Sequence, residues 1–292
     1  MGPLNVSNAA GRPEPGATRG PTEALDAARP APPRGPAPPR FGHGYHRQVT
    51  KNIPAIAVEG LRKRYGEVRA VDGVTFEVAH GEFYGILGPN GAGKTTTLEL
   101  VEGLREPDEG SARLLGQPSW PRDPGLLRRI GVQLQASAFF EKLTAREQIH
   151  TFAALYGVSS RRADEMLETV GLTEKAGTRD DKLSGGQAQR LSIACALVHD
   201  PELVFLDEPT TGLDPQARRN LWDLLREINA QGRTVVLTTH YLDEAEILCD
   251  RVAIMDAGRI LRVGAPSELI AELGVGNLED VFLQLTGREY RE

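Results

Sequence analysis

The chain has 292 residues, with 34 Lys and Arg against 40 Asp and Glu, a formal net charge of −6, and only two Cys. This balance argues against a protein that coats nucleic acid, which needs clustered positive charge. No apolar run approaches the roughly 18 residues that span a bilayer, so we expect no membrane crossing by this chain. Two Cys cannot form a disulfide framework, and a reducing cytosol is the simplest compartment.

The N-terminal segment differs in composition from the rest of the chain. Residues 1–40 hold ten of the twenty prolines, with Ala, Gly and Arg between them. Such a segment cannot bury enough apolar surface to offset the entropy lost on ordering. We therefore expect a disordered tail over residues 1–52. It lacks a continuous apolar core, so we do not expect a secretory signal.

From residue 56 onward the pattern is that of a folded domain with strands and helices in alternation. Short apolar or alternating runs bounded by turn residues predict strands at 56–58, 74–78, 83–87, 203–206, 234–238 and 252–255. Helical stretches separate the later strands, and one of them should begin at Pro215, a residue suited to a first helical turn. Strands that alternate with helices indicate a parallel sheet covered on both faces.

The stretch from residue 143 to 171 has no clear strand. Residues 145–156 and 161–170 carry apolar side chains at helical spacing. We therefore predict an inserted helical subdomain over about residues 137–182.

The first chemical motif follows the predicted strand at 83–87. Residues 88–95 fit the phosphate-binding loop pattern, Gly, four residues, Gly-Lys-Thr. Glycines allow successive backbone N–H groups to surround phosphate oxygens, and the following helix directs the positive end of its dipole at them. Lys94 can then reach the β- and γ-phosphates, and the Thr95 hydroxyl can bind Mg²⁺. A glycine-rich turn without a ligand is the plain alternative, but a strand before the loop and a helix after it argue against that alternative.

Two adjacent carboxylates end the predicted strand at 203–206, namely Asp207 and Glu208. Ligands of parallel sheets bind beyond the carboxyl ends of the strands. We therefore expect Asp207 beside the metal and Glu208 beside the γ-phosphate. One acid would polarise the Mg²⁺ shell, and the other would take a proton from the attacking water.

A second anion-binding motif occurs at residues 183–187, Leu-Ser-Gly-Gly-Gln. Ser184, Gly185, Gly186 and Gln187 stand at the start of a predicted helix that runs to residue 198. Helix N-termini of this kind bind anions. One nucleotide does not need two such sites in one chain, so this motif distinguishes between families.

With these motifs in this order, residues from about 56 to 255 resemble the ATP-binding-cassette (ABC) ATPases. The resemblance implies an α/β fold: a P-loop NTPase core with a parallel sheet, an N-terminal antiparallel β subdomain and an inserted α-helical subdomain. It implies ATP and Mg²⁺ as cofactors and ATP hydrolysis coupled to transport. We expect the ABC ATPase domain to cover residues 53–275 and a short C-terminal helical extension to cover residues 276–292.

The resemblance also assigns roles to residues outside the local motifs. Tyr65 resembles the aromatic residue that stacks on adenine, and His240 resembles the switch histidine on the γ-phosphate. A lone Tyr or His is more often a packing or satisfied polar residue, so these two assignments depend on their order relative to the other motifs. Asp214 lies in a stretch, residues 212–215, that resembles the loop crossing the dimer interface.

Gln135 resembles the glutamine that touches Mg²⁺ and the attacking water and relays to the membrane partner. It is preferred over Gln133 because the family glutamine usually lies five residues after the Ile of an Ile-Gly pair, here Ile130.

These assignments give three sets of candidate site residues. The catalytic set is Lys94, Gln135, Glu208 and His240. The metal ligands are Thr95, Gln135 and Asp207. The nucleotide contacts are Tyr65, Gly88, Pro89, Asn90, Gly91, Ala92, Gly93, Lys94, Thr95, Thr96, Ser184, Gly185, Gly186, Gln187 and Asp214.

Residues 277–287 resemble the end of ATPase subunits of daunorubicin-resistance-type drug exporters. The resemblance implies a subunit that powers efflux of a small hydrophobic, drug-like compound through a separate transmembrane permease. It implies head-to-tail pairing with a second ABC subunit, a homodimer being expected, with each ATP between one phosphate loop and the other subunit's signature motif. No nucleic-acid partner is expected, and the permease would hold the chain at the cytoplasmic face of the membrane.

Two alternatives stay open. A soluble ABC protein of translation or chromosome maintenance usually has two cassettes or a long coiled-coil insertion, whereas this chain has one copy of each motif and no long heptad run. An ABC subunit for another cargo, such as an importer or a polysaccharide exporter, shares the chemistry and differs only in what is transported.

Overall fold

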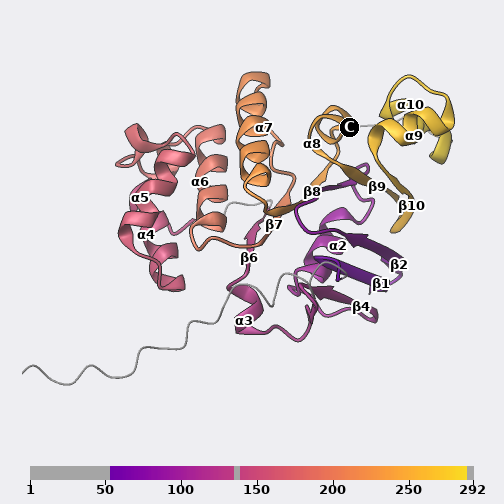
Figure 1. Ribbon diagram of the computed structural model, residues 1–292, viewed down its shortest axis with the longest axis horizontal. Helices are drawn as coiled ribbons and strands as arrows, with labels where there is room; N and C mark the ends of the chain where they lie inside the picture. Colours follow the sequence, from indigo (N-terminus) through magenta and orange to yellow (C-terminus); the bar gives the residue numbers. More distant parts are fainter. Residues whose placement is uncertain (1–52, 135–138, 288–292) are drawn as a thin grey trace, which may run out of the picture. The chain divides into compact units, whose positions relative to one another are not determined.

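The computed structural model describes residues 53–134 and 139–287. The expected tail over residues 1–52 and the candidate glutamine Gln135 lie outside the described residues. A four-stranded sheet, a six-stranded sheet and the helices packed on them make up the described part of the chain (Figure 1). No helix in this part is both long enough and apolar enough to cross a membrane.

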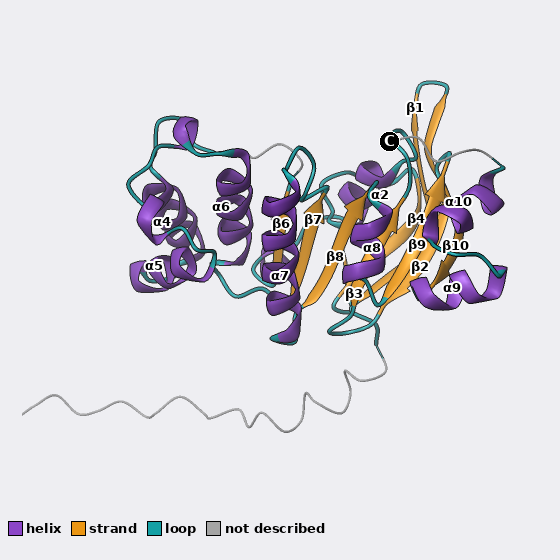
Figure 2. Ribbon diagram, turned by 90° about the horizontal axis from the view of Figure 1, so that it is seen from above, coloured by secondary structure: helices purple, strands orange, loops and turns teal. Residues whose placement is uncertain are grey.

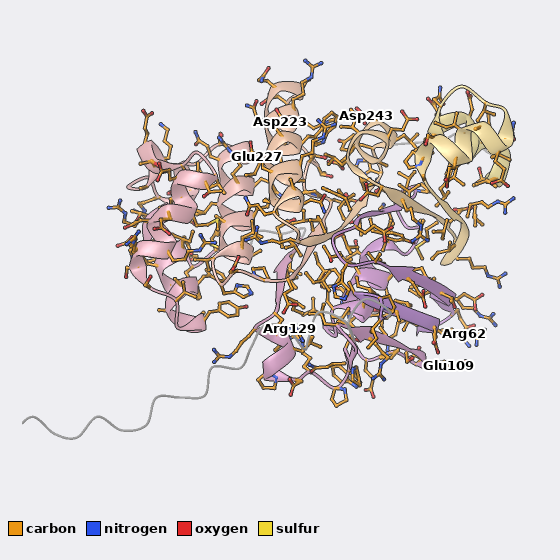
Figure 3. The ribbon with its side chains drawn as sticks, viewed as in Figure 1. Arg62, Glu109, Arg129, Asp223, Glu227 and Asp243 are labelled. Carbon is orange, nitrogen blue, oxygen red and sulfur yellow. The ribbon has the colours of Figure 1, made fainter. Side chains whose placement is uncertain are left out.

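The four-stranded sheet is antiparallel and has the order β2-β1-β4-β5. Its strands are β1 (Ile56–Tyr65), β2 (Val68–Val78), β4 (Glu109–Leu114) and β5 (Gln117–Pro118). The first two are longer than the predicted strands at 56–58 and 74–78, because the end of their hairpin is exposed and shows no hydrophobic alternation. An exposed ion pair, Arg62 with Glu109 at 2.6 Å, joins β1 to β4 (Figure 3).

The six-stranded sheet has the order β10-β9-β3-β8-β7-β6. Its strands are β3 (Phe83–Leu87), β6 (Ile130–Gln133), β7 (Leu203–Asp207), β8 (Thr234–Thr239), β9 (Arg251–Asp256) and β10 (Arg259–Gly264). Neighbours from β9 to β6 are parallel, as predicted, whereas β10 pairs with β9 in the antiparallel sense. Most of β10 is exposed or half-buried, so it carries no apolar run that would have revealed it.

Helices pack on both faces of this sheet (Figure 2). The α-helices are α2 (Lys94–Val101), α3 (Pro124–Leu127), α4 (Ala145–Tyr156), α5 (Ser160–Thr169), α6 (Gly185–Leu197), α7 (Pro215–Ala230), α8 (Leu242–Leu248), α9 (Pro266–Leu273) and α10 (Leu278–Thr286). The helices predicted at 145–156 and 161–170 are present as α4 and α5. In both ribbon views, α4, α5 and α6 form one group that lies apart from α2 (Figures 1 and 2).

Two apolar cores lie on opposite faces of the six-stranded sheet. Alternate residues of a strand point to opposite faces of the sheet. Leu206 and Leu237 belong to the core shared with the helical group. Their neighbours Phe205 and Val236 belong to the core shared with α2 and the antiparallel sheet. Both faces of β3, β7 and β8 are buried. This explains why these strands appear in the sequence as continuous apolar runs.

Helix α7 shows how local sequence fixes an element that borders the site. Asp214 caps its start by accepting hydrogen bonds from the N–H groups of Gln216 and Ala217, at 3.0 and 2.9 Å, and Pro215 occupies the first turn. Its apolar side chains, including Leu221 and Leu225, are buried. The acidic residues at positions 223 and 227 lie on its other side (Figure 3).

Candidate active site

The phosphate-loop residues connect the end of β3 to the start of α2. Gly91 and Gly93 have φ values of 80° and 99°, a region that favours glycine. A Cβ atom at Gly93 would lie 2.2 Å from the carbonyl oxygen of Ala70, and one at Gly88 would lie 2.2 Å from that of Met255. The loop is therefore held tightly between β2 and β9. Gly93 caps α2 without a side chain, which leaves the first N–H groups of the helix available to an anion.

Lys94, Glu208 and His240 meet at one point although they come from separate parts of the chain. The Nζ atom of Lys94 lies 3.1 Å from Oε1 of Glu208, with both side chains buried. The Nδ1 atom of His240 lies 3.3 Å from Oε2 of Glu208. Lys94 also donates to the carbonyl oxygen of Pro89 at 3.2 Å. The structure thus brings together three of the four residues predicted to be catalytic.

The environment of Glu208 keeps its carboxyl group ionised. Burial by itself would raise its pKa, but Lys94, His240 and the hydroxyl of Thr211 together hold the pKa of Glu208 below its usual range. Thr211 donates to Oε2 of Glu208 at 3.1 Å. An ionised carboxylate that is screened from solvent can accept a proton from a water molecule, as a general base must.

Asp207 and Thr95 place two hard oxygen ligands side by side. The Thr95 hydroxyl donates to Oδ1 of Asp207 at 3.2 Å, and the Thr238 hydroxyl also donates to Oδ1. Burial raises the pKa of Asp207, while the hydrogen bonds from Thr238 and Thr95 act in the opposite direction. A hydroxyl and a carboxylate at this separation fit Mg²⁺, which prefers oxygen ligands and takes few of them from the protein.

The signature residues form a separate site at the start of α6. The Ser184 hydroxyl accepts from the N–H of Gln187 at 3.3 Å, and the Gln187 side chain accepts from the N–H of Ser184 at 3.0 Å, which makes a capping box. These residues line a hollow of about 300 Å³ with Gly185, Gly186 and Asp214. Because α2 and α6 belong to different parts of the fold, the two anion-binding motifs occupy distinct places on the chain.

Tyr65 lies at the end of β1, where its side chain is exposed. The guanidinium group of Arg105 stands over its ring, 5.7 Å from the ring centroid. An exposed ring at a hairpin end is able to stack on a base, but its contact with adenine stays a prediction. The roles assigned to the other candidate residues stay predictions as well.

Two residues of the site were not predicted. Thr238 and Thr211 both donate hydrogen bonds to the acids that follow β7. Thr211 could have been suspected from its position three residues after Glu208. Thr238 could not, because its contact depends on β8 lying next to β7 in the sheet.

Comparison with known proteins identifies the family. A family model described as ABC transporter matches residues 71–211, and a model of an AAA domain matches residues 181–242. The chain is 46% identical over 231 residues to the Nod factor export ATP-binding protein I of Paraburkholderia xenovorans, which covers 77% of this chain and 76% of that protein. The chain belongs to the ABC transporter ATP-binding family. A relative of the same name from Rhizobium sp. is 43% identical over 75% of this chain and 73% of its own length.

Solved structures agree with this assignment to the ABC family. An ATP-binding subunit of an ABC transporter matches with a TM-score of 0.71 at 30% identity, over 80% of this chain and 99% of that one. An ATP-binding cassette in a dimeric, post-hydrolysis state with ADP and Pi matches with a TM-score of 0.66 at 29% identity, over 72% of this chain and 98% of that one. The predicted ABC ATPase fold is confirmed. As a member of this family the chain is an ATPase that uses ATP and Mg²⁺ and serves as a subunit of a transporter.

Proposed function

We propose that this ABC ATPase powers export of a small hydrophobic, drug-like compound through a separate transmembrane permease. The permease would dock on the side of the chain formed by β6, α4 and α6 and would hold it at the cytoplasmic face of the membrane. The export direction is supported by relatives that are named Nod factor export ATP-binding proteins.

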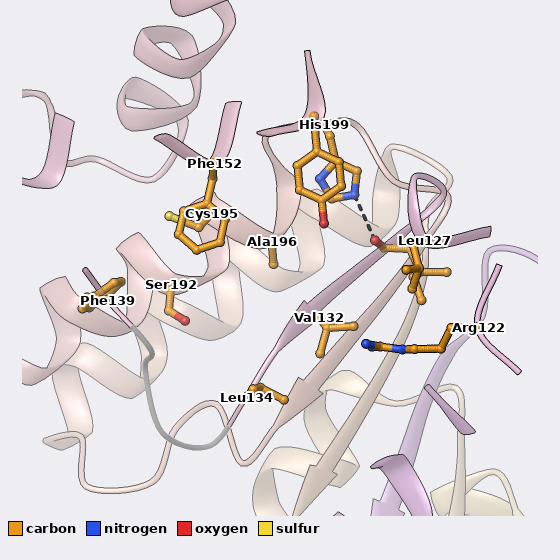
Figure 4. Close-up of a pocket in the computed structure, with 12 residues that line it drawn as sticks. Arg122, Leu127, Val132, Leu134, Phe139, Phe152, Ser192, Cys195, Ala196 and His199 are labelled. Atoms are coloured by element: carbon orange, nitrogen blue, oxygen red, sulfur yellow. Dashed lines mark hydrogen bonds between the residues drawn. The ribbon is translucent and has the colours of Figure 1, made fainter. Parts of the chain in front are cut away.

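The observation that carries the permease proposal is an apolar groove between β6 and the helical group (Figure 4). Its volume is about 290 Å³, and aromatic and aliphatic side chains line most of it, among them Leu134, Phe139, Phe152 and Tyr156. Amphipathic helices of partner proteins bind in apolar grooves by placing their apolar face in them. Leu134 directly precedes the candidate glutamine Gln135 in sequence, so a partner seated here would touch the segment that leads to the active site.

One side wall of the groove is formed by stacked rings. The rings of Tyr156 and His199 stack with centroids 3.8 Å apart and planes 6° apart. His199 is linked by a 2.9 Å hydrogen bond between Nε2 and the carbonyl oxygen of Ile130 (Figure 4). Burial lowers the pKa of His199, which favours its neutral form. A preformed apolar wall of this kind suits a short amphipathic element of a membrane protein.

We assign the hydrolysis steps to the residues gathered around Glu208. In this assignment Lys94 binds the terminal phosphates, Glu208 accepts the proton of the attacking water, and His240 contacts the γ-phosphate. Thr95 and Asp207 would hold Mg²⁺, which when bound neutralises developing charge on the phosphate oxygens. The signature residues around Ser184 would serve the ATP bound by a second subunit in a head-to-tail dimer.

The relatives also suggest a second candidate cargo. Their printed name specifies export of Nod factor, so a compound of that kind is the alternative to a drug-like one. Both cargoes would use the same ATPase chemistry, because the cargo is handled by the permease.

The permease proposal is tested by membrane recovery after co-expression with a candidate permease encoded beside this chain. Phe140 does not line the groove, but it is half exposed and its ring lies 5.9 Å from that of the lining residue Phe152. We expect Phe140→Asp to reduce recovery with membranes at least about tenfold, because a charge would be buried in an apolar contact. The ATPase rate of the isolated subunit should not change.

The matched control is Leu155→Asp, which introduces the same charge at a more exposed apolar residue of α4 that also lies outside the groove lining. Equal losses in both variants would contradict docking in the groove. Equal membrane recovery in cells lacking every candidate permease would favour a soluble, non-transport ABC ATPase.

A further inference from the structure

Thr238 is a buried residue of β8 that lies beside the two acids at the end of β7. It is 0% exposed and is the direct partner of Asp207 in the parallel pairing of these strands. Paired residues of parallel strands point to the same face of a sheet. The Thr238 hydroxyl and the Asp207 carboxylate therefore share the face on which α2 and Thr95 lie.

The Thr238 hydroxyl contacts the side chain of Asp207 and the backbone of Glu208. The Oγ1 atom of Thr238 donates its proton to Oδ1 of Asp207 and accepts a hydrogen bond from the N–H of Glu208 at 3.0 Å. The same N–H lies 3.2 Å from the carbonyl oxygen of Thr238. A hydroxyl has one proton to donate, so the donor capacity of Thr238 is fully used by Asp207.

The backbone of Glu208 adopts a conformation that needs such support. Its φ angle is +47°, in the left-handed region that residues with side chains rarely adopt. Strained conformations of this kind persist only where the surrounding structure holds them. The hydrogen bonds from the Glu208 N–H to Thr238 fix the peptide group that orients the Glu208 side chain toward Lys94 and His240.

We propose that Thr238 is a positioning residue for ATP hydrolysis, whose hydroxyl fixes the candidate metal ligand Asp207 and the candidate base Glu208 relative to each other. The proposal rests on the roles proposed above for these two acids and is independent of the cargo and the permease. The other two buried threonines of β8 have different partners, because the hydroxyl of Thr234 accepts from the N–H of Gly81 and that of Thr239 accepts from the N–H of Tyr241.

The test compares Thr238→Val with Thr238→Ser and with a control, Thr234→Val. Thr234 is buried at the opposite end of β8, and its hydroxyl accepts from the N–H of Gly81 at 2.9 Å. Both valine variants lose a buried hydroxyl in the same strand, so they should lower the melting temperature of the ligand-free protein by similar amounts. Of the two, only Thr238→Val removes hydrogen bonds to Asp207 and Glu208.

We expect Thr238→Val to lower kcat by about 10- to 100-fold, the range expected when a hydrogen bond to a charged group is lost. The Mg²⁺ concentration for half-maximal binding of a fluorescent ATP analogue should rise about tenfold. Binding of the same analogue in EDTA should not change. Thr238→Ser should restore both kcat and the Mg²⁺ response, and Thr234→Val should keep wild-type values of both.

A Thr238→Val protein with wild-type kcat and Mg²⁺ response would overturn the proposal, and so would a Thr234→Val protein impaired to the same degree. If the valine variant does not fold, the pair Thr238→Ser and Thr238→Ala gives the same comparison, because these side chains differ by one oxygen atom. Asp207→Asn and Glu208→Gln are assayed in parallel. If neither impairs hydrolysis, the roles of the acids are wrong. If both do and Thr238→Val does not, the positioning role alone is wrong.

Discussion

Replacing Glu208 with Gln should have two effects that can be measured separately. The change keeps the shape of the side chain but removes its negative charge. In the structure Glu208 lies 3.1 Å from the Lys94 ammonium, and both side chains are almost fully buried. Loss of one partner from a buried ion pair costs about 3–5 kcal/mol, because the remaining charge is left uncompensated. Lys94 keeps its hydrogen bond to Pro89, so we expect a cost near 3 kcal/mol, the lower end of that range.

This cost corresponds to a fall in melting temperature of about 6–12 °C for a domain of this size. The fall should be seen by calorimetry on the nucleotide-free protein at neutral pH. With ATP and Mg²⁺ present, the phosphates supply the negative charge that Lys94 has lost, so the difference between variant and wild type should largely disappear. Phosphate release should drop by about 10² or more, because Gln cannot accept the proton of the attacking water.

The control for this prediction is Glu202→Gln. Glu202 pairs with Arg129 at 2.6 Å, a shorter distance than in the pair with Lys94, but both side chains are substantially exposed. Exposed pairs contribute at most about 1 kcal/mol, so we expect a shift of a few degrees or less, with or without ATP. If Glu208→Gln is no less stable than Glu202→Gln, the argument from burial fails. Near-normal turnover would assign the base to another residue.

Two further changes test the interior and the dimer. Glu244 is 0% exposed and accepts from the Trp222 indole N–H at 2.9 Å, and burial raises the pKa of its carboxyl. The folded state then binds this proton more tightly than the unfolded state, so the contribution of Glu244 to stability declines as pH rises above its ordinary pKa of about 4.5. In urea titrations Glu244→Gln should therefore become more stable relative to the wild type as pH rises. Lys94→Ala and Ser184→Arg should each abolish most of the ATPase activity. An equal mixture of the two variants should recover up to roughly a quarter of the wild-type activity, because half the dimers are mixed and each mixed dimer has one intact site. No recovery in covalently linked mixed dimers would contradict head-to-tail pairing.

The parts of the fold predicted from sequence are those with local causes. The phosphate loop could be predicted because its glycines, Lys94 and Thr95 lie next to one another in the sequence and form a local pattern. The strands β3, β7 and β8 were found because burial on both faces gives continuous apolar runs. The helices α4 and α7 were found from apolar spacing and from Pro215 in a first turn.

The features that the sequence did not predict either lie at the surface or depend on contacts between residues far apart in the chain. Strand β10 lies at a sheet edge, so its side chains follow no buried pattern. The contact of Thr238 with Asp207 requires β8 to lie beside β7, and no local sequence pattern indicates the order of strands in the sheet. The ion pair between Lys94 and Glu208 depends on the same order. Sequence motifs therefore predicted which residues gather at one candidate site, but not the individual hydrogen bonds and ion pairs among them.

The strand order also gathers the residues of the candidate site around one strand. Strand β8 lies between β3, which leads into the phosphate loop, and β7, which ends in the two acids. His240 directly follows β8, and Thr238 lies within it, so a shift at the end of this one strand changes the contacts of Asp207 and Glu208 together. Under the roles proposed above, a permease docked beside β6 and a γ-phosphate beside His240 would both act on the pair β7 and β8, which the Thr238 hydroxyl joins at Asp207 and Glu208.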